Sequence, residues 1–133
     1  MANFPLKIVT PDRMVFDADA EKIILRTVGG DVCILAHHID YAAPLGIGEA
    51  RVTDAQGNTR IAACSGGMLS VSCGEARVMA TTFEWVEEID LARAETARDQ
   101  AQKKLESMNR AEADYAAVEA KLKRALVRIQ VKQ

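Results

Sequence analysis

The chain has 133 residues, of which 49% are hydrophobic and 27% are charged, and its formal net charge is −2. This length suits one ordinary domain or two small ones, and the composition is that of a globular protein rather than a disordered one. The near-neutral charge argues against nucleic acid as a partner, and no apolar run approaches the roughly 18 to 20 residues that direct insertion across a membrane requires.

The first part of the chain has the pattern of short strands separated by turns. Pro11, the Gly29-Gly30 pair and the segment 54–58 carry the turn signals. The stretch 32–35 is apolar on both faces, which suits the core of a sandwich. Strands at this spacing predict a β-sandwich or barrel. The expected strands are 6–9, 14–17, 21–27, 32–35, 49–53, 59–64, 68–71 and 77–82.

Three cysteines lie in this first part, at positions 33, 64 and 73, and none forms a CxxC pair. An odd number without close pairs is typical of small buried or half-buried thiols in a reducing compartment. Because metal sites need close ligand pairs, we expect no metal site.

The sequence changes character after Gly74, since the segment 75–133 contains no Gly, Pro or Cys. Apolar residues recur at spacings of three and four over 91–108 and again over 115–129, which predicts two helices with a break near Ser107 to Asn109. A short connection makes these helices an αα-hairpin. Their apolar stripes are thin and rich in Ala, so the hairpin should depend on a partner surface or on the preceding domain.

Charge is unevenly distributed over the predicted hairpin. The segment 87–106 holds six acids and four bases, whereas 121–133 holds five bases and no acid. Opposite charges favour antiparallel closure of the hairpin, and bases are also favourable near a helix C-terminus. Alternatively, the basic end binds an acidic patch on another subunit.

Asp90 and Arg93, at the start of the first predicted helix, have the chemistry of a binding site. They are three residues apart and share one helix face. A carboxylate accepts hydrogen bonds from an amine or a hydroxyl group, and a guanidinium stacks on a base or holds phosphate. The alternative is that Asp90 and its acidic neighbours only cap the helix, where negative charge is favourable.

No catalytic site is expected from the motifs. The glycine pairs are not followed by the Lys-Ser or Lys-Thr of a P-loop, and no nucleophile stands beside a base. His37 and His38 have no cluster of further ligands around them, so they are more typical of a loop that contacts a neighbour.

Taken in order, several short motifs resemble the epsilon subunit of the F-type ATP synthase over essentially the whole chain. They are Ile8-Val9-Thr10-Pro11, Val15-Phe16, Gly30-Asp31, Ile34-Leu35 with His38, Pro44-Leu45, Gly48, Ala63 through Met68, Glu84 and Glu87 through Ala94. The resemblance implies an N-terminal β-sandwich of about ten strands (1–85) followed by a C-terminal two-helix antiparallel hairpin (86–133). Two departures affect a loop: His37 replaces a Gly that often precedes His38, and 40–43 replaces a bulkier apolar run.

The resemblance also implies a function without catalysis. Such a subunit belongs to the central stalk, where it links the gamma subunit to the membrane rotor ring of a complex that translocates protons or sodium ions. Its hairpin inhibits ATP hydrolysis by extending between the catalytic alpha and beta subunits. The expected location is peripheral, on the cytoplasmic face of the bacterial plasma membrane, or on the thylakoid membrane if the chain is plastid-encoded. The alternative function is a stand-alone nucleotide-sensing adaptor domain.

Specific residues follow from matching this chain to the family pattern. Asp31 and His38 are the expected contacts to the rotor ring and gamma. No cofactor is required, but ATP is expected as a regulatory ligand. The residues that match its binding motif are Glu84, Ile89, Asp90, Arg93, Ala94, Arg124 and Arg128.

Overall fold

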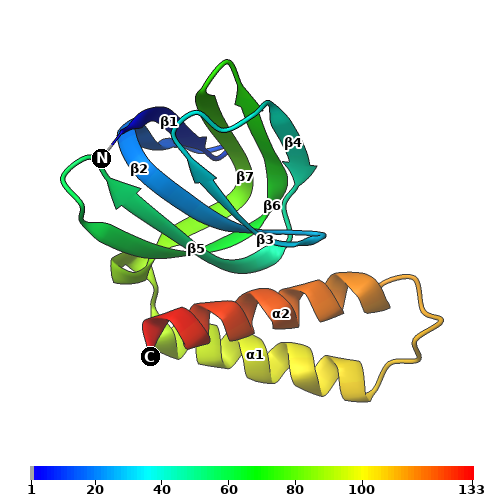
Figure 1. Ribbon diagram of the computed structural model, residues 1–133. Helices are drawn as coiled ribbons and strands as arrows, with labels where there is room; N and C mark the ends of the chain where they lie inside the picture. Colours follow the sequence, from blue (N-terminus) through cyan, green and yellow to red (C-terminus); the bar gives the residue numbers. More distant parts are fainter. Residues whose placement is uncertain (1) are drawn as a thin grey trace.

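A computed structural model describes residues 2–133 and shows a β-sandwich lying on a pair of helices (Figure 1). The sandwich precedes the helices along the chain. Its strands are β1 (Phe4–Val9), β2 (Met14–Thr27), β3 (Gly30–Leu35), β4 (Tyr41–Pro44), β5 (Ile47–Asp54), β6 (Thr59–Ser72) and β7 (Glu75–Trp85). The 3₁₀ helix η1 (Val86–Glu88) leads to helices α1 (Leu91–Glu106) and α2 (Tyr115–Lys132).

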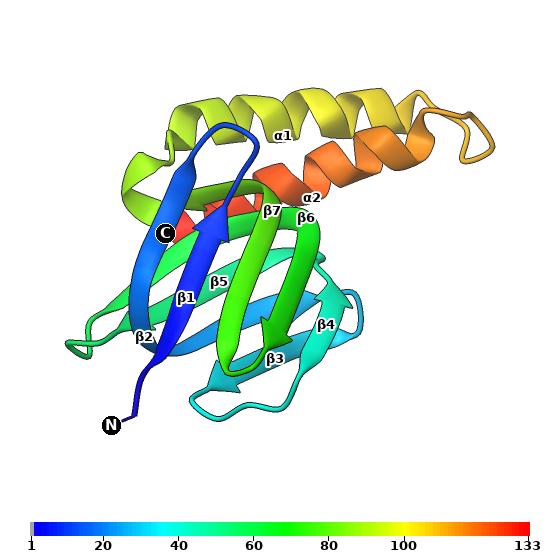
Figure 2. The ribbon, with the colours of Figure 1, turned by 90° about the horizontal axis from the view of Figure 1, so that it is seen from above.

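The strands form one sheet that closes on itself. Their order is β1-β7-β6-β5-β2-β3, β4 pairs with β6, and β1 pairs in parallel with β7 and antiparallel with β2. The closure folds the sheet into two layers, which Figure 2 shows from above. The predicted fold class, a sandwich followed by a helical hairpin, is confirmed.

Residues 2–133 form seven strands rather than about ten, because two strands are long enough to serve both layers. β2 and β6 have 14 residues each. β2 contains the predicted strands 14–17 and 21–27, and β6 contains 59–64 and 68–71. Gly66 and Gly67 have φ of +66° and +104°, and they stand where β6 changes its partner from β5 to β4. Left-handed φ favours glycine, so this kink lets one strand replace two.

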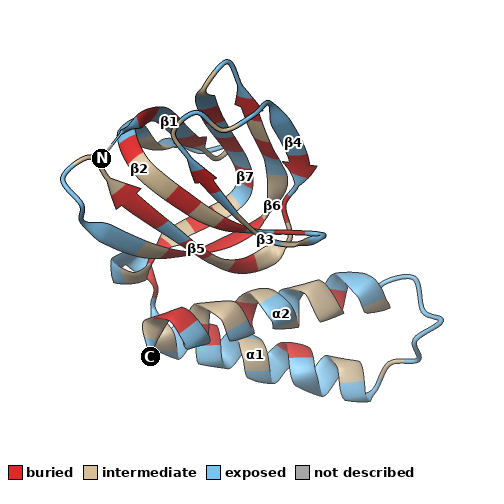
Figure 3. Ribbon diagram, viewed as in Figure 1, coloured by how far each residue is buried: buried red, intermediate tan, exposed pale blue. Residues whose placement is uncertain are grey.

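The core of the sandwich follows from alternation along each strand. In β1, Phe4, Leu6 and Ile8 are buried while the residues between them are exposed, as the two-residue period of a strand requires (Figure 3). The largest fully buried side chains are Leu6, Ile8, Ile23, Leu25, Ile34, Leu69, Val52 and Val78.

The prediction that 32–35 is core on both faces is wrong. Only Ile34 is fully buried there, whereas Cys33 is exposed and Leu35 is 47% exposed. The reason is that successive side chains of β3 point to opposite faces of the sheet, and only one face of a strand in this sandwich meets the core. The expectation of buried thiols is likewise correct for Cys64 but not for Cys33 or Cys73, which are exposed.

The two helices pack antiparallel through small apolar side chains. The buried residues of the hairpin are Ala94 and Ala101 from α1 and Val118, Ala125, Ile129 and Val131 from α2. No ion pair among residues 2–133 joins α1 to α2, so the structure does not support closure by opposite charges. Alanine leaves room for close approach, and apolar packing holds the hairpin together. The connection spans 107–114, longer than the predicted break.

The hairpin docks on the sandwich through α2, with α1 on its outer side. A small apolar cluster forms the contact, and we call it the seam. It consists of buried Ala63, Ile89 and Val131 with half-buried Ile61, Val86 and Val127. Beside it, the ammonium of Lys132 donates to the carbonyl oxygen of Val86 over 2.9 Å. The hairpin is therefore in a compact arrangement against the sheet.

Candidate functional site

The candidate site lies at the joint between the last strand and the first helix. Asp90 is the N-cap of α1, and its Oδ1 accepts a hydrogen bond from the backbone N–H of Arg93 over 3.1 Å. This contact satisfies one of the amide groups that a helix start leaves free. The spacing of three between Asp90 and Arg93 thus allows Asp90 to cap the helix, while the Arg93 side chain remains exposed.

A cavity of about 280 Å³ opens at this joint. Its lining residues are Glu84, Glu88, Ile89, Asp90, Arg93, Ala94, Ala97 and Arg128. The structure thus brings together six of the seven residues matched to the ATP motif, from β7, α1, α2 and the segment between β7 and α1. Arg124, the seventh, lines an adjoining groove to which Arg128 also contributes.

The cavity is crossed by an ion pair between the sandwich and the hairpin. The Nε of Arg128 donates to Oε1 of Glu84 over 2.5 Å, and the two side chains are 25% and 34% exposed. Charge-assisted hydrogen bonds of this kind are short and strong for their type. In this arrangement Glu84 occupies part of the donor surface that Arg128 would offer to a phosphate.

Glu88 is a lining residue that the sequence motif did not single out. Its Oε1 accepts from Nη2 of Arg13 over 2.8 Å and from the backbone N–H of Trp85 over 3.1 Å. The hydrogen bond from Arg13 is the largest of the influences that lower the pKa of Glu88. Arg13 also donates to the carbonyl oxygen of Phe83 over 3.4 Å. The ion pair between Arg13 and Glu88 thus connects η1 to the turn between β1 and β2. The only sequence signal is that Glu88 follows Trp85 by three residues, the spacing of a capping box.

The lining suits the binding of a ligand that has both donors and negative charge. Glu84, Glu88 and Asp90 supply carboxylate acceptors, and Arg93 and Arg128 supply guanidinium donors. Arg93 takes part in none of the ion pairs found among residues 2–133. Ala94 and Ala97 leave space between these groups. The arrangement can therefore hold such a ligand from several sides.

The comparisons with known proteins cover both halves of the chain. The family model "ATP synthase, Delta/Epsilon chain, beta-sandwich domain" matches residues 3–86, and "ATP synthase, Delta/Epsilon chain, long alpha-helix domain" matches residues 87–133. The ATP synthase epsilon chain of Caldicellulosiruptor bescii is 38% identical over 98% of this chain and 94% of its own. The chain belongs to the ATP synthase epsilon chain family.

A second epsilon chain agrees with this assignment, and a solved structure has a similar fold. The sodium ion specific ATP synthase epsilon chain of Propionigenium modestum is 34% identical, over 98% of this chain and 94% of its own. A chain in the mitochondrial ATP synthase of Euglena gracilis has the same fold, with a TM-score of 0.87 at 23% identity, covering 100% of this chain and 83% of that one.

The two residues expected to contact partners lie apart in this epsilon chain, near opposite ends of β3. Asp31 accepts from Nε of Arg26 over 2.6 Å, and both side chains are more than half exposed. His38 lies in the loop after β3, where its Nδ1 is 2.7 Å from the carbonyl oxygen of Ile39 and its ring meets the edge of Tyr41. Their contact with the rotor ring and gamma stays a prediction.

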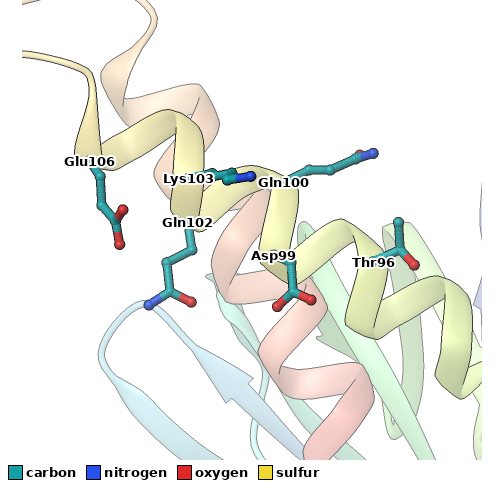
Figure 4. A pocket seen from close by; sticks show the side chains of 6 residues that line it. All are labelled: Thr96, Asp99, Gln100, Gln102, Lys103 and Glu106. Atoms are coloured by element: carbon teal, nitrogen blue, oxygen red, sulfur yellow. The ribbon is translucent and has the colours of Figure 1, made fainter.

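A second hollow of about 400 Å³ lies along α1, away from the joint (Figure 4). It is lined by Thr96, Asp99, Gln100, Gln102, Lys103 and Glu106, all from this one helix. Because no second element contributes to its lining, a ligand there would be held from one side only. We therefore place the candidate site of the epsilon chain at the joint.

Proposed function

We propose that this epsilon chain is a non-catalytic subunit of the central stalk of an F-type ATP synthase. The sandwich links the gamma subunit to the rotor ring, and the hairpin is a reversible brake on ATP hydrolysis. Family membership supports the first part. So does the likeness in fold to chains of two mitochondrial ATP synthase structures, one of OSCP, F1 and the c-ring and one of the central stalk and c-ring. The ion that the complex translocates, a proton or sodium, depends on the ring.

The observation that carries the brake proposal is the small size of the seam. Among residues 2–133, a cluster with three buried side chains, one ion pair and one lysine hydrogen bond hold α2 to the sandwich and to the segment that follows β7. By contrast, the sandwich has its own core of 19 buried residues. Elements with few buried apolar contacts open at low free energy, so the hairpin is the part of the chain that can detach.

In the extended form, the hairpin rises along gamma and enters the space between the catalytic alpha and beta subunits. The basic segment 121–132 then meets acidic residues there and stalls rotation in the hydrolysis direction. In the compact form, Lys132 is instead held by the carbonyl oxygen of Val86. The two forms therefore compete for the same basic end.

ATP is proposed as a regulator that favours the compact form and not as a required cofactor. Glu84 comes from the sandwich, Arg93 from α1 and Arg128 from α2, so a nucleotide that contacts all three is bound fully only while the hairpin is docked. A ligand shifts such an equilibrium by its difference in affinity for the two forms. We assign the base to the Asp90 and Ala94 side of the cavity and the phosphates to Arg124 and Arg128.

The brake is tested by removing the hairpin from the assembled complex. A chain that ends at Trp85 should still assemble, because the sandwich core remains intact, and hydrolysis by the complex should rise. Unchanged hydrolysis by a complex shown to contain the truncated chain would refute the brake.

The nucleotide site is tested by calorimetry with ATP on the isolated chain. Arg93→Ala should weaken binding, whereas Arg98→Ala should not, since Arg98 lies outside the cavity and pairs with Asp99. An absence of heat at millimolar ATP would remove this role.

A pull-down with gamma tests the proposed partners. No helix between residues 2 and 133 is long and apolar enough to cross a membrane. As a subunit of the synthase complex, the chain is proposed to lie peripherally on the cytoplasmic face of the bacterial plasma membrane, or on the thylakoid membrane of a plastid. ATP binding without capture of gamma would instead point to a stand-alone adaptor domain.

A further inference from the structure

A row of apolar side chains crosses five strands on the face of the sandwich away from the hairpin. Val9 of β1 is paired with Met14 of β2 on one side and with Met79 of β7 on the other. Met79 is paired with Met68 of β6, and Met68 with Pro44 of β4. Residues directly opposite each other in a sheet point to the same side, so these five side chains form one row, which we call the methionine row.

The methionines of this row are open to solvent. The chain has five methionines, and the three in the row, Met14, Met68 and Met79, are 52%, 40% and 49% exposed. The hairpin docks against β5 and the first half of β6, whereas β1 and β4 lie on the far side of the sandwich from it (Figure 1). Met108, which follows α1, is half-buried by contrast. The accessible thioethers of the described residues are therefore gathered on one face.

An exposed thioether reacts with hydrogen peroxide by transfer of one oxygen atom. The sulfur lone pair attacks one peroxide oxygen, the S–O bond forms and the O–O bond breaks. The leaving hydroxide takes the proton of the transferred oxygen and becomes water. The sulfur is oxidised to a sulfoxide and the peroxide is reduced, so no further reactant is needed. The product is polar where the side chain was apolar, and methionine sulfoxide reductases reverse the change.

We propose that the methionine row is a site of reversible oxidation by hydrogen peroxide, and that its oxidation weakens the binding of gamma. The second step rests on the proposed function. The row ends on β4, whose first residue, Tyr41, meets the ring of His38 in a T-shaped contact, so it adjoins the residue expected to contact gamma. Thioethers are adaptable apolar groups that suit a binding surface, whereas three sulfoxides there must lose bound water before a partner can cover them.

Peptide mass spectrometry of the folded full chain after brief exposure to hydrogen peroxide tests the site. Met14, Met68 and Met79 should each gain one oxygen before Met108 does, because their side chains are more exposed. Circular dichroism should show an unchanged fold, since the modified groups lie on the surface. Oxidation of Met108 ahead of the row, or unfolding that accompanies oxidation of the row, would overturn the site.

The effect on gamma is tested by binding measurements on the oxidised chain, with gamma added only after catalase has destroyed the peroxide. A variant that combines Met14→Leu, Met68→Leu and Met79→Leu keeps the face apolar but cannot form sulfoxides, and leucine has nearly the volume of methionine. Its matched control is Met108→Leu, which leaves the row intact. Both variants keep all three cysteines, so any oxidation of thiols affects them and the parent alike.

We expect oxidation to weaken gamma binding about tenfold in the parent and in Met108→Leu, and to change it by less than about twofold in the leucine variant of the row. Treatment of the oxidised parent with methionine sulfoxide reductase should restore binding. Equal weakening in all three chains, or no weakening in the parent, would overturn the proposal and leave the proposed function standing. An unoxidised parent that does not bind gamma would instead refute the proposed function, and the second step of the proposal with it.

Discussion

The substitution Val131→Asp should detach the hairpin and leave the sandwich folded. Val131 is 8% exposed and packs in the seam with Ala63 and Ile89. Burial of one such aliphatic side chain contributes about 1.5 to 3 kcal/mol. The substitution loses this term, and a carboxylate left in the seam adds a desolvation cost of several kcal/mol. Among residues 2–133, the seam fully buries two large side chains and half-buries three more. The combined cost is of the same order as the contribution of this small cluster, so the docked form should no longer dominate.

Amide hydrogen exchange read together with Trp85 fluorescence follows this change. Trp85 is the only tryptophan, and it is buried against Phe83 in the sandwich. We expect amides of 91–133 to lose protection while sandwich amides and the emission of Trp85 keep their parent values. Gln130→Asp is the matched control, because it places the same charge one residue away at an exposed position. Unchanged protection of the hairpin, or loss of protection in the sandwich as well, would refute the reasoning.

Three further predictions concern stability and reactivity. Gly67→Ala should lower the unfolding free energy by about 2 kcal/mol or more, because the new Cβ would overlap the carbonyl oxygen of Met79. Gly57 faces open space, so Gly57→Ala should lower the melting temperature much less. The hydrogen bond from Arg13 lowers the pKa of Glu88 below its usual value of 4.5, so ionised Glu88 stabilises the fold. Glu88→Gln should therefore be less stable than the parent at pH 7, and the difference in unfolding free energy should disappear as the pH falls well below 4.5. A difference that does not change with pH would contradict this. Burial raises the pKa of the Cys64 thiol to about 12, so alkylation of the native chain should modify two cysteines, and the third only after denaturation, which mass spectrometry distinguishes.

Local patterns in the sequence were sufficient to predict the architecture. The loss of Gly, Pro and Cys after Gly74 and the change of period indicated where strands end and helices begin, and the last strand does end at Trp85. The strand count was harder to predict. Glycines usually mark turns, but Gly66 and Gly67 allow β6 to continue through a kink, which only the pairing partners on each side reveal.

The sequence predicted most of the residues that line the candidate site, but it did not predict which of them form ion pairs with each other. The motif pointed to an acid at Glu84 and a base at Arg128, yet these residues are 44 positions apart, and nothing local shows that they join. Docking of the hairpin brings that pair together. Arg13 and Glu88 are 75 positions apart, and they pair because the closed sheet brings the β1–β2 turn to the joint. Long-range partners depend on topology, whereas capping by Asp90 depends only on its neighbours.

The closure of the sheet has a mechanical consequence. β1, β7, β6, β5 and β2 form a ring in which each strand is hydrogen-bonded to two others of the ring, whereas, among residues 2–133, β3 pairs only with β2 and β4 only with β6. Shearing one strand of the ring would break backbone hydrogen bonds with two neighbours at once. The sandwich should therefore resist twisting, whereas the short η1 segment and the seam are the places where the hairpin can move relative to the sandwich. In a rotating shaft, such a part would transmit torque through the ring of strands and leave the hairpin free to change position without softening the coupling.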